Sequence, residues 1–313
     1  MKLLRYKKNP ILRPNKRNWW ESKAVFNPGA VYTADRVHLL PRAIGEYEDY
    51  VSRLGHYVST DGFNFQRVTD EPIFVPQEEY EKWGCEDPRI TELEGKFYMT
   101  YTALSKPVKE GGGPPRAAIA STTDFHSFHR YGIITPPSTD NKDVVIFPEK
   151  IEGKYVILHR PHNWVGAKYG TDRPSIWIGY SEDLKDLYDH KVVMKPEQTW
   201  ESSKIGAGPP PIKTRKGWLL IYHGVDENTI YRAGVALLDL QDPSKVIKRS
   251  ANPILKPEKK YEKIGDVPNV VFPEGAVVID DELFVYYGGA DKVCCVATAP
   301  LDELLNHLLA FQG

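Results

Sequence analysis

The segment Asn27-Pro28-Gly29-Ala30-Val31 opens a pattern that recurs along the whole chain, in which a proline precedes a short apolar stretch by seven to ten residues. Successive copies lie 60 to 63 residues apart, and their prolines are Pro28, Pro88, Pro148, Pro210 and Pro273. The apolar stretches are rich in aromatic and β-branched residues, a composition that favours strands. They occupy residues 37–43, 97–103, 155–161, 218–224 and 283–289.

A further strand is expected later in each unit, because a second run of strand-forming residues follows every apolar stretch. These runs occupy residues 53–60, 116–123, 175–181, 232–238 and 292–298. A repeat of this length that is built from several short strands is typical of β-propellers. We therefore predict an all-β fold, a five-bladed β-propeller, in which residues 1–313 form a single domain.

The two ends of the chain predict how such a ring would close. Residues 9–12, Asn-Pro-Ile-Leu, repeat residues 252–255, which end the fourth and outermost strand of a blade. The fifth unit stops after its third strand, near Thr298. The segment from Lys2 to Leu12 is therefore predicted to supply the missing outer strand of the last blade and to remove an open sheet edge. Residues 301–311 are predicted to form one short helix.

Composition limits the partners and the compartment. The net charge of −1 provides no overall field that would attract nucleic acid or an anionic membrane. The chain lacks both a signal-peptide pattern and a run of about 18 apolar residues. Its three cysteines, two of them adjacent, make no disulfide framework. These features predict a cytoplasmic protein that binds neither nucleic acid nor membrane.

Equivalent positions in different repeats become neighbours in a propeller, because the innermost strands of all blades line one central channel. Two sets of equivalent positions, one near the end of each second strand and one six residues before each repeat proline, are rich in basic residues. A cluster of this kind suits a dianion, since arginine offers a planar pair of donors and lysine a point charge. The alternative is that these side chains are solvated or pair with nearby acids. The basic residues are Arg42, Lys142, Arg160, Lys204 and His223.

Asp87 is the best placed of several carboxylates expected near the same mouth. It lies at the start of an inner strand, beside Pro88, which restricts the backbone, and close to Arg89. The alternative roles for Asp87 are a helix cap or a salt bridge with Arg89. A glycosidase that hydrolyses its substrate with its own groups needs a second carboxylate. The candidates for that second group are Glu149, Asp266 and Glu274.

The chain resembles glycoside hydrolase family 130, the five-bladed propellers that include β-mannoside phosphorylases. The resemblance is carried by motifs at residues 84–90 (Gly-Cys-Glu-Asp-Pro-Arg-Ile), 141–149 (Asn-Lys-Asp-Val-Val-Ile-Phe-Pro-Glu), 204–210 (Lys-Ile-Gly-Ala-Gly-Pro-Pro) and 286–291 (Tyr-Tyr-Gly-Gly-Ala-Asp). It implies an inverting phosphorolysis, in which inorganic phosphate attacks the anomeric carbon of a terminal β-mannosyl unit. The products would be α-mannose 1-phosphate and a shortened sugar.

The resemblance also implies roles for individual residues. Asp87 matches the family's general acid, which passes its proton through a hydroxyl of the mannosyl ring. The phosphate-binding positions are matched by Lys142, Arg160, Lys204 and His223. The sugar-contacting positions are matched by Asn27, Arg53 and Asp291, and the repeat geometry adds Arg42. The family needs no metal and no organic cofactor, since phosphate is a co-substrate.

The sequence thus predicts a β-mannooligosaccharide phosphorylase that acts on a β-mannoside and inorganic phosphate, with β-1,4 linkages preferred to β-1,2. Family members are commonly oligomeric, so a homo-oligomer is expected. One alternative is a β-mannosidase that uses water on the same fold, and the retained cationic set argues against it. A second alternative is a non-catalytic sugar-binding propeller, which would not need both Asp87 and a phosphate cluster.

Overall fold

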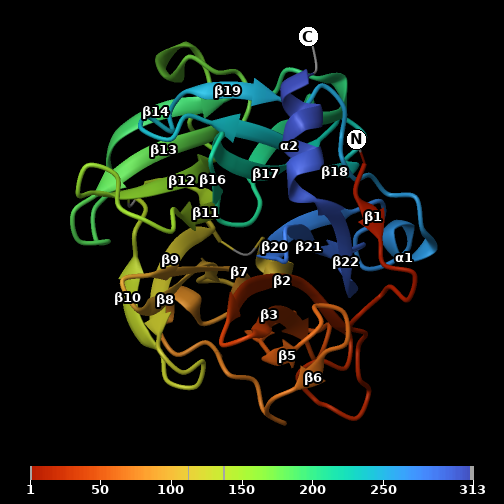
Figure 1. Ribbon diagram of the computed structural model, residues 1–313. Helices are drawn as coiled ribbons and strands as arrows, with labels where there is room; N and C mark the ends of the chain where they lie inside the picture. Colours follow the sequence, from red (N-terminus) through yellow and green to blue (C-terminus); the bar gives the residue numbers. More distant parts are fainter. Residues whose placement is uncertain (1, 112, 137, 311–313) are drawn as a thin grey trace.

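The computed structural model describes residues 2–111, 113–136 and 138–310 of the chain. These residues form 22 β-strands and only two α-helices, α1 (Lys260–Lys263) and α2 (Leu301–Ala310). The prediction of an all-β fold is confirmed. Figure 1 shows the strands in successive groups that follow the order of the sequence.

The first two units share one nine-stranded sheet, because β4 and β7 pair in parallel at Ser52 and Gly84. In the first unit the expected third strand is divided into two pieces, β4 and β5, which both pair with β3. The strands of the first unit are β2 (Ala24–Thr33), β3 (Arg36–Ile44), β4 (Ser52–Leu54), β5 (Tyr57–Ser59) and β6 (Gln66–Arg67). Those of the second are β7 (Gly84–Leu93), β8 (Lys96–Leu104), β9 (Arg116–Thr122) and β10 (His129–Ile133).

The third and fourth units form separate antiparallel sheets of four and five strands. The first strand of the fourth unit is interrupted by the prolines at 209–211, and both of its pieces pair with β17. The strands of the third unit are β11 (Asn141–Ile146), β12 (Tyr155–Pro161), β13 (Ile176–Ser181) and β14 (Tyr188–Met194). Those of the fourth are β15 (Lys204–Ala207), β16 (Ile212–Thr214), β17 (Gly217–Val225), β18 (Tyr231–Leu238) and β19 (Val246–Arg249).

The fifth unit joins the two ends of the chain, as the sequence predicted. Its strands are β20 (Val271–Ile279), β21 (Glu282–Gly289) and β22 (Val293–Pro300), and β1 (Leu4–Arg5) pairs antiparallel with β22 as the outermost strand. Figure 1 shows β1, in red, beside β22, in blue. Helix α2 follows β22 directly and ends at Ala310, and the predicted helical residue Phe311 lies outside the described residues.

Two-residue turns connect the first and second strands of three units. Each turn has two residues with positive φ, for example Glu94 at 53° and Gly95 at 75° between β7 and β8. Turns with two positive φ angles match the right-handed twist of the strands that they join. Equivalent turns lie at Ala34-Asp35 and Asp280-Asp281.

Irregular pairing in the first strands directs polar side chains toward one place. The register of β2, β7 and β11 shifts at Asn27, Asp87 and Asp143, and these three residues have φ angles of 46°, 54° and 56°. A β-bulge bends its strand and re-aims the side chain that it carries. The repeated bulge therefore presents an amide and two carboxylates from three neighbouring units.

The repeat prolines mark the units, but they do not mark the register of the strands. Pro88 lies inside β7, whereas Pro148 lies two residues beyond the end of β11. Pairing shows the structural counterparts, because Glu86 faces Thr102 and Lys142 faces Arg160. Counting six residues back from each proline therefore does not give equivalent positions.

Candidate active site

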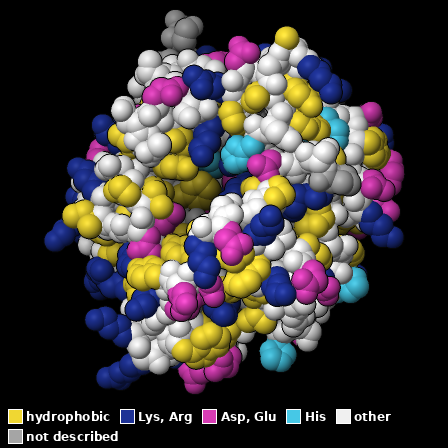
Figure 2. Space-filling view, turned by 180° about the vertical axis from the view of Figure 1, so that it is seen from behind, with side chains coloured by type: hydrophobic (Ala, Val, Ile, Leu, Met, Phe, Trp, Pro, Cys, Tyr) yellow, Lys and Arg dark blue, Asp and Glu magenta, His cyan; other side chains and the backbone are white. Residues whose placement is uncertain are grey.

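A pocket of about 200 Å³ collects most of the polar residues that the sequence singled out. It is lined from the first or second strands of several units, which is where the bulges point. Eight of the nine predicted site residues line it, namely Asn27, Arg42, Asp87, Lys142, Arg160, Lys204, His223 and Asp291. Elsewhere, the face shown in Figure 2 carries interspersed acidic and basic side chains, as a net charge of −1 suggests.

Asp87 is held at the pocket by two donors. Its Oδ1 atom accepts hydrogen bonds from Asn27 Nδ2 at 2.9 Å and from Arg42 Nη1 at 3.1 Å. Burial raises the pKa of Asp87, but the charges of Arg42 and Lys142 outweigh burial and lower the pKa below its usual value. With only protein groups around it, Asp87 is therefore ionised at neutral pH.

Arg42 is the main partner of the acidic residues on this side of the pocket. Its guanidinium also donates to Ser52 Oγ at 2.9 Å and contacts Glu86. Burial alone would lower the pKa of Arg42, yet Glu86 and Asp87 raise it above the usual value. Arg42 is thus a permanent cation beside Asp87.

The predicted phosphate-binding residues line the same pocket as Asp87. Lys142 and Arg160 face each other across β11 and β12, and Lys142 Nζ lies 3.4 Å from Glu86 Oε2. Lys204 Nζ lies over the ring of Tyr231, 5.4 Å from its centroid. Burial and the charge of Arg160 lower the pKa of Lys204 to about 8. Lys142, Arg160 and the weakly basic Lys204 thus converge on the same space.

His223 contributes a neutral ring to this group. Its side chain is fully buried, and burial lowers its pKa to about 3 although Asp143 partly opposes that effect. The ring packs against Phe272, with 4.5 Å between their centroids. A neutral imidazole can donate one hydrogen bond to an anion without adding charge.

Asp291 is a predicted sugar-binding residue whose acidity is strongly altered by its surroundings. Burial raises its pKa to about 7, and the neighbouring Asp87 and Glu86 carboxylates add to that effect while Arg42 opposes it. Asp291 follows β21, in a turn where its φ angle is 50°. Near neutral pH it can therefore donate or accept a hydrogen bond to a sugar hydroxyl.

Arg53 is not brought into the pocket, in contrast to the other predicted residues. Its guanidinium lies over the ring of Trp19, 4.9 Å from the centroid, and donates to the carbonyl of Val51 at 3.1 Å. The short strand β4 directs this side chain toward Trp19. Because β4 is one piece of a divided strand, its register could not be read from the repeat.

Four polar or aromatic residues that the sequence did not single out as ligands also line the pocket. Asp143 follows Lys142 directly, and His162 lies two residues after Arg160 and contacts its guanidinium. Phe272 is the structural counterpart of Phe26, since Phe26 faces Arg42 of β3 and Phe272 faces Gly288 of β21. The fourth residue is Tyr231.

None of the three candidate second carboxylates lines the pocket. Glu149 is paired with Lys213 at the surface, and Asp266 accepts hydrogen bonds from Tyr47, Tyr50 and Lys292. Glu274 is fully buried, with its Oε1 atom 3.3 Å from Arg89. None of these three carboxylates is therefore placed to act as a base on a water molecule in the pocket.

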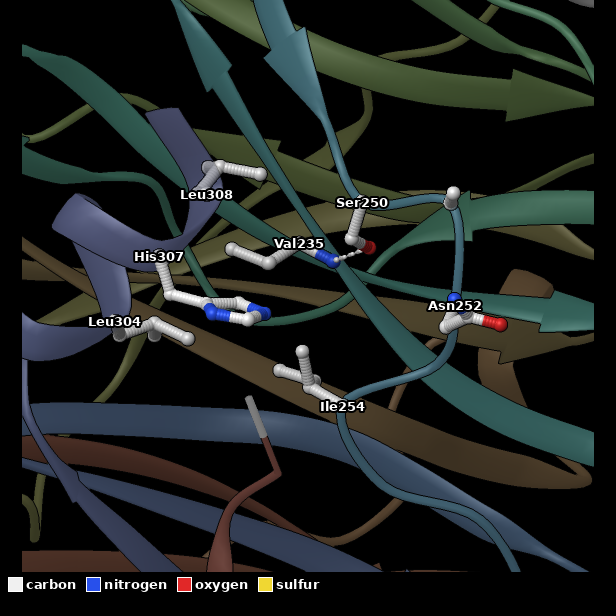
Figure 3. Close-up of a pocket in the computed structure, with 8 residues that line it drawn as sticks. Val235, Ser250, Asn252, Ile254, Leu304, His307 and Leu308 are labelled. Carbon is white, nitrogen blue, oxygen red and sulfur yellow. Dashed lines mark hydrogen bonds between the residues drawn. The ribbon is translucent and has the colours of Figure 1, made fainter. Parts of the chain in front are cut away.

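A second pocket lies between α2 and the strands β18 and β19, and it has a different character (Figure 3). Its lining is mostly apolar, with Val235, Leu304 and Leu308 among the side chains, and Ser250 Oγ accepts a hydrogen bond from the amide of Val235 at 3.1 Å. Among the described residues, no Asp, Glu, Lys or Arg side chain lines it. This pocket lacks the charges that a dianion requires.

The described residues offer neither a cluster of metal ligands nor a helix suited to span a membrane. They hold no group of three or more His, Cys, Asp or Glu side chains placed to bind a metal ion. Among the described helices, none combines the length and the apolar character that a membrane span requires.

An all-β chain with a carboxylate beside a cationic pocket has the features of a carbohydrate-active enzyme that uses an anionic co-substrate. The sequence pattern of the family described as "beta-1,4-mannooligosaccharide phosphorylase" matches residues 3–309. The chain belongs to this family, glycoside hydrolase family 130, and it is an enzyme.

Three similar proteins place the chain within the family. It is 46% identical over 310 residues to the 1,2-β-oligomannan phosphorylase of Thermoanaerobacter sp. (strain X514), with 97% of this chain and 99% of that protein covered. It is 45% identical over 319 residues to the β-1,2-mannobiose phosphorylase of the same organism, with 97% and 99% covered. The structure of β-1,2-mannobiose phosphorylase from Listeria innocua, in complex with β-1,2-mannobiose, matches with a TM-score of 0.86 and 31% identity over 99% of this chain and 100% of that one.

Proposed function

We propose that this enzyme catalyses the inverting phosphorolysis of β-mannosides, giving α-D-mannose 1-phosphate and a shortened sugar. The observation that carries the proposal is the convergence of Asp87 with Lys142, Arg160, Lys204 and His223 in one pocket. The basic groups would hold phosphate in line with the anomeric carbon, which lowers the entropic cost of the reaction and stabilises developing charge. Asn27, Arg42 and Asp291 would contact the mannosyl unit.

The proton of the leaving group would come from Asp87. The bond from the anomeric carbon to the bridging oxygen breaks while a phosphate oxygen bonds to the opposite face of that carbon. The proton reaches the bridging oxygen through a hydroxyl of the mannosyl ring. Because Lys142 lowers the pKa of Asp87, a phosphate dianion beside Lys142 would offset that effect. We therefore expect Asp87 to take up its proton as phosphate binds.

For the linkage we propose β-1,2. The two relatives that share 46% and 45% identity are both named for 1,2-linked mannosides, as is the solved structure of similar fold. The expected preference for β-1,4 over β-1,2 is therefore not supported, although the family description names β-1,4-mannooligosaccharides. Loop shapes around the pocket set the linkage, and the repeat does not determine them.

We also propose that the five units close into a five-bladed propeller that forms a single domain. This is supported by contacts of β2 with β7, of β7 with β11, of β11 with β15, and of β20 with both β18 and β2. A cytoplasmic location, a homo-oligomeric assembly and a reaction without metal or organic cofactor remain part of the proposal.

The first test is incubation of the purified enzyme with β-1,2- and β-1,4-mannobiose, with and without inorganic phosphate, and measurement of mannose 1-phosphate. We expect mannose 1-phosphate from β-1,2-mannobiose only when phosphate is present. Free mannose without phosphate would identify a β-mannosidase. The absence of any product from either sugar would contradict the proposed phosphorolysis of these two disaccharides.

The second test addresses the acid. We expect Asp87→Asn to lower the rate of phosphorolysis by at least about 100-fold, because the amide cannot donate the catalytic proton. The fold should be retained, since the amide keeps the shape of the side chain, and circular dichroism would check this. A folded variant that keeps the wild-type rate would exclude Asp87 as the acid.

A further inference from the structure

We propose that Asp143 is the positioning residue of the phosphate site: its carboxylate fixes Arg160 and, with Gly206, sets the place of His223. The inference rests on the proposed phosphorolysis and assigns to Asp143 a role that the sequence did not predict. Asp143 lies on the bulge of β11, beside Lys142, and its side chain is almost completely buried. It lines the pocket, but its carboxylate oxygens are already hydrogen-bonded to arginine side chains of the protein.

Both oxygens of the Asp143 carboxylate have cationic partners. Oδ1 accepts a hydrogen bond from Arg89 Nη2 at 3.0 Å, and Oδ2 accepts one from Arg160 Nε. These charges lower the pKa of Asp143 far below its usual range although burial raises it. The carboxylate therefore stays ionised and binds Arg160 by its Nε atom, which determines where the two Nη atoms lie.

Arg89 provides a rigid base for Asp143. Its side chain is buried and donates to the carbonyls of Gly208 at 2.8 Å, Ala207 at 3.2 Å and Asp87 at 3.1 Å. Arg89 is thus anchored to the backbone of two units and also to the residue that is proposed as the acid. Through Arg89, the position of Asp143 is tied to the position of Asp87.

Gly206 leaves the space that Asp143 and His223 share. A Cβ atom at position 206 would lie 2.2 Å from Asp143 Oδ2 and 2.6 Å from His223 Cε1. His223 Nε2 itself lies 3.5 Å from Asp143 Oδ2, which is longer than a normal hydrogen bond. The His223 ring is therefore located by packing against this carboxylate and Phe272 rather than by a short bond. A side chain at Gly206 would displace one group or the other.

Two explanations of Asp143 make opposite predictions about phosphate binding. If Asp143 were only a counter-charge, its neutralisation would leave more positive charge in the pocket and phosphate would bind more tightly. If Asp143 positions Arg160 and His223, its neutralisation would release these donors and phosphate would bind more weakly. The sign of the change therefore separates the two roles.

The experiment compares the wild type with Asp143→Asn and Gly206→Ala. The first variant changes the charge and keeps the shape, while the second keeps every charge and changes the shape. Phosphate binding would be measured by titration calorimetry with inorganic phosphate alone, and the KM values for phosphate and mannoside by steady-state kinetics. We expect both variants to weaken phosphate binding at least about ten-fold. Such sites are sensitive to geometry, because a misplacement of about 1 Å can lower the reaction rate on the order of 100-fold. The mannoside KM should change much less.

A matched control is Asp226→Asn, which removes a carboxylate from another Asp–Arg pair. Asp226 Oδ2 accepts a hydrogen bond from Arg232 Nη1 at 2.9 Å, and neither residue lines the pocket. Phosphate binding should be unchanged in this variant.

The outcomes separate this inference from the proposed function. Unchanged or tighter phosphate binding by folded Asp143→Asn or Gly206→Ala would overturn the positioning role alone. A wild-type enzyme that binds no phosphate would overturn both the phosphorolysis and the positioning role. If Asp143→Asn fails to fold, Gly206→Ala still tests the inference, because it retains the carboxylate and its charge.

Discussion

Burial and neighbouring charges together set the protonation state of each ionisable side chain in this pocket. Side chains of the same type, such as Asp87 and Asp291, therefore differ in their protonation at neutral pH. Lys204 is a weaker base than an exposed lysine, His223 is neutral, and Asp291 titrates near neutrality. Asp87 remains ionised because its cationic neighbours outweigh its burial. These differences make the pH dependence of the enzyme a direct probe of the site.

The affinity for phosphate should fall in alkaline solution, because Lys204 loses its proton above a pKa of about 8. Between pH 7 and pH 9 the protonated fraction of such a group falls about ten-fold, so the phosphate KM should rise by a similar factor. Lys204→Arg should abolish most of this rise, since arginine stays protonated. Phosphate KM values measured at the two pH values would check this, and an equal rise in the arginine variant would contradict it.

Glu274 should make the folded protein less stable as pH rises. Burial, together with Asp87 and Asp143, raises its pKa well above the usual value. Above about pH 4.3 the unfolded chain releases this proton while the folded protein retains it. The unfolded state then binds fewer protons, so the free energy of unfolding falls with rising pH until the folded pKa is passed.

Glu274→Gln should remove this pH-dependent penalty, because glutamine does not ionise. We expect the variant to gain stability relative to the wild type on going from pH 5 to pH 7, by up to about 1.4 kcal/mol per pH unit. Urea unfolding at both pH values would measure it. A variant that loses stability relative to the wild type over that interval would mean that Glu274 is ionised and paired with Arg89.

Arg42, Arg160 and His223 could be predicted to meet in one pocket because they occupy equivalent positions in different repeats, whereas Asn27 and Asp291 were matched through the family resemblance. The prediction for Arg53 also came from the family resemblance, and the divided strand β4 directs that side chain toward Trp19. Pairing of the basic residues with nearby acids such as Asp143 was one expected alternative, but which atoms of Asp143 meet Arg89 and Arg160 depends on the bulge that shifts the register of β11. Pairing of Asp143 with Arg160 requires knowledge of that local bend.

At the scale of elements, the existence of the strands was predictable but their exact pairing was not. Strand composition and turn residues marked the second strand of every unit. The division of the third strand into β4 and β5, and of the first strand of unit four into β15 and β16, follows from local interruptions such as the prolines at 209–211. Proline cannot donate to a strand ladder, so it breaks pairing at its own position.

Helix α2 should contribute to stability and not to catalysis. Leu305 is buried in the apolar cluster that α2 forms with β18 and β22, and this cluster borders the second pocket rather than the candidate active site. Leu305→Ala should lower the free energy of unfolding by about 2–4 kcal/mol. The kcat/KM for phosphorolysis, measured well below the melting temperature, should be unchanged.

The matched control on the same helix is Leu309→Ala, because Leu309 is 39% exposed. It should cost much less stability than Leu305→Ala. A large loss of activity in folded Leu305→Ala would contradict the separation between α2 and the candidate active site.

At the scale of the whole molecule, the segment before β2 connects units that are far apart in sequence. The amide of Leu3 donates to the carbonyl of Ile254, and the amide of Ile11 donates to the carbonyl of Cys294. Arg5 Nε donates to Glu262 Oε1 at 2.7 Å. The fifth unit therefore depends on residues at the other end of the chain for its outer edge.

Deletion of residues 2–12 should therefore lower the melting temperature substantially. The deletion exposes the edge of β22 and removes the buried side chains of Leu3 and Leu12, each of which stabilises by about 1.5–3 kcal/mol. At about 2–4 °C per kcal/mol for a large domain, the expected loss is on the order of 10 °C. Leu4→Ala is the matched control, because Leu4 is 72% exposed on the same strand and should change the melting temperature little. Thermal unfolding followed by circular dichroism would measure both variants, and a deletion variant that melts within about 2 °C of the wild type would show that β1 does not stabilise the fifth unit.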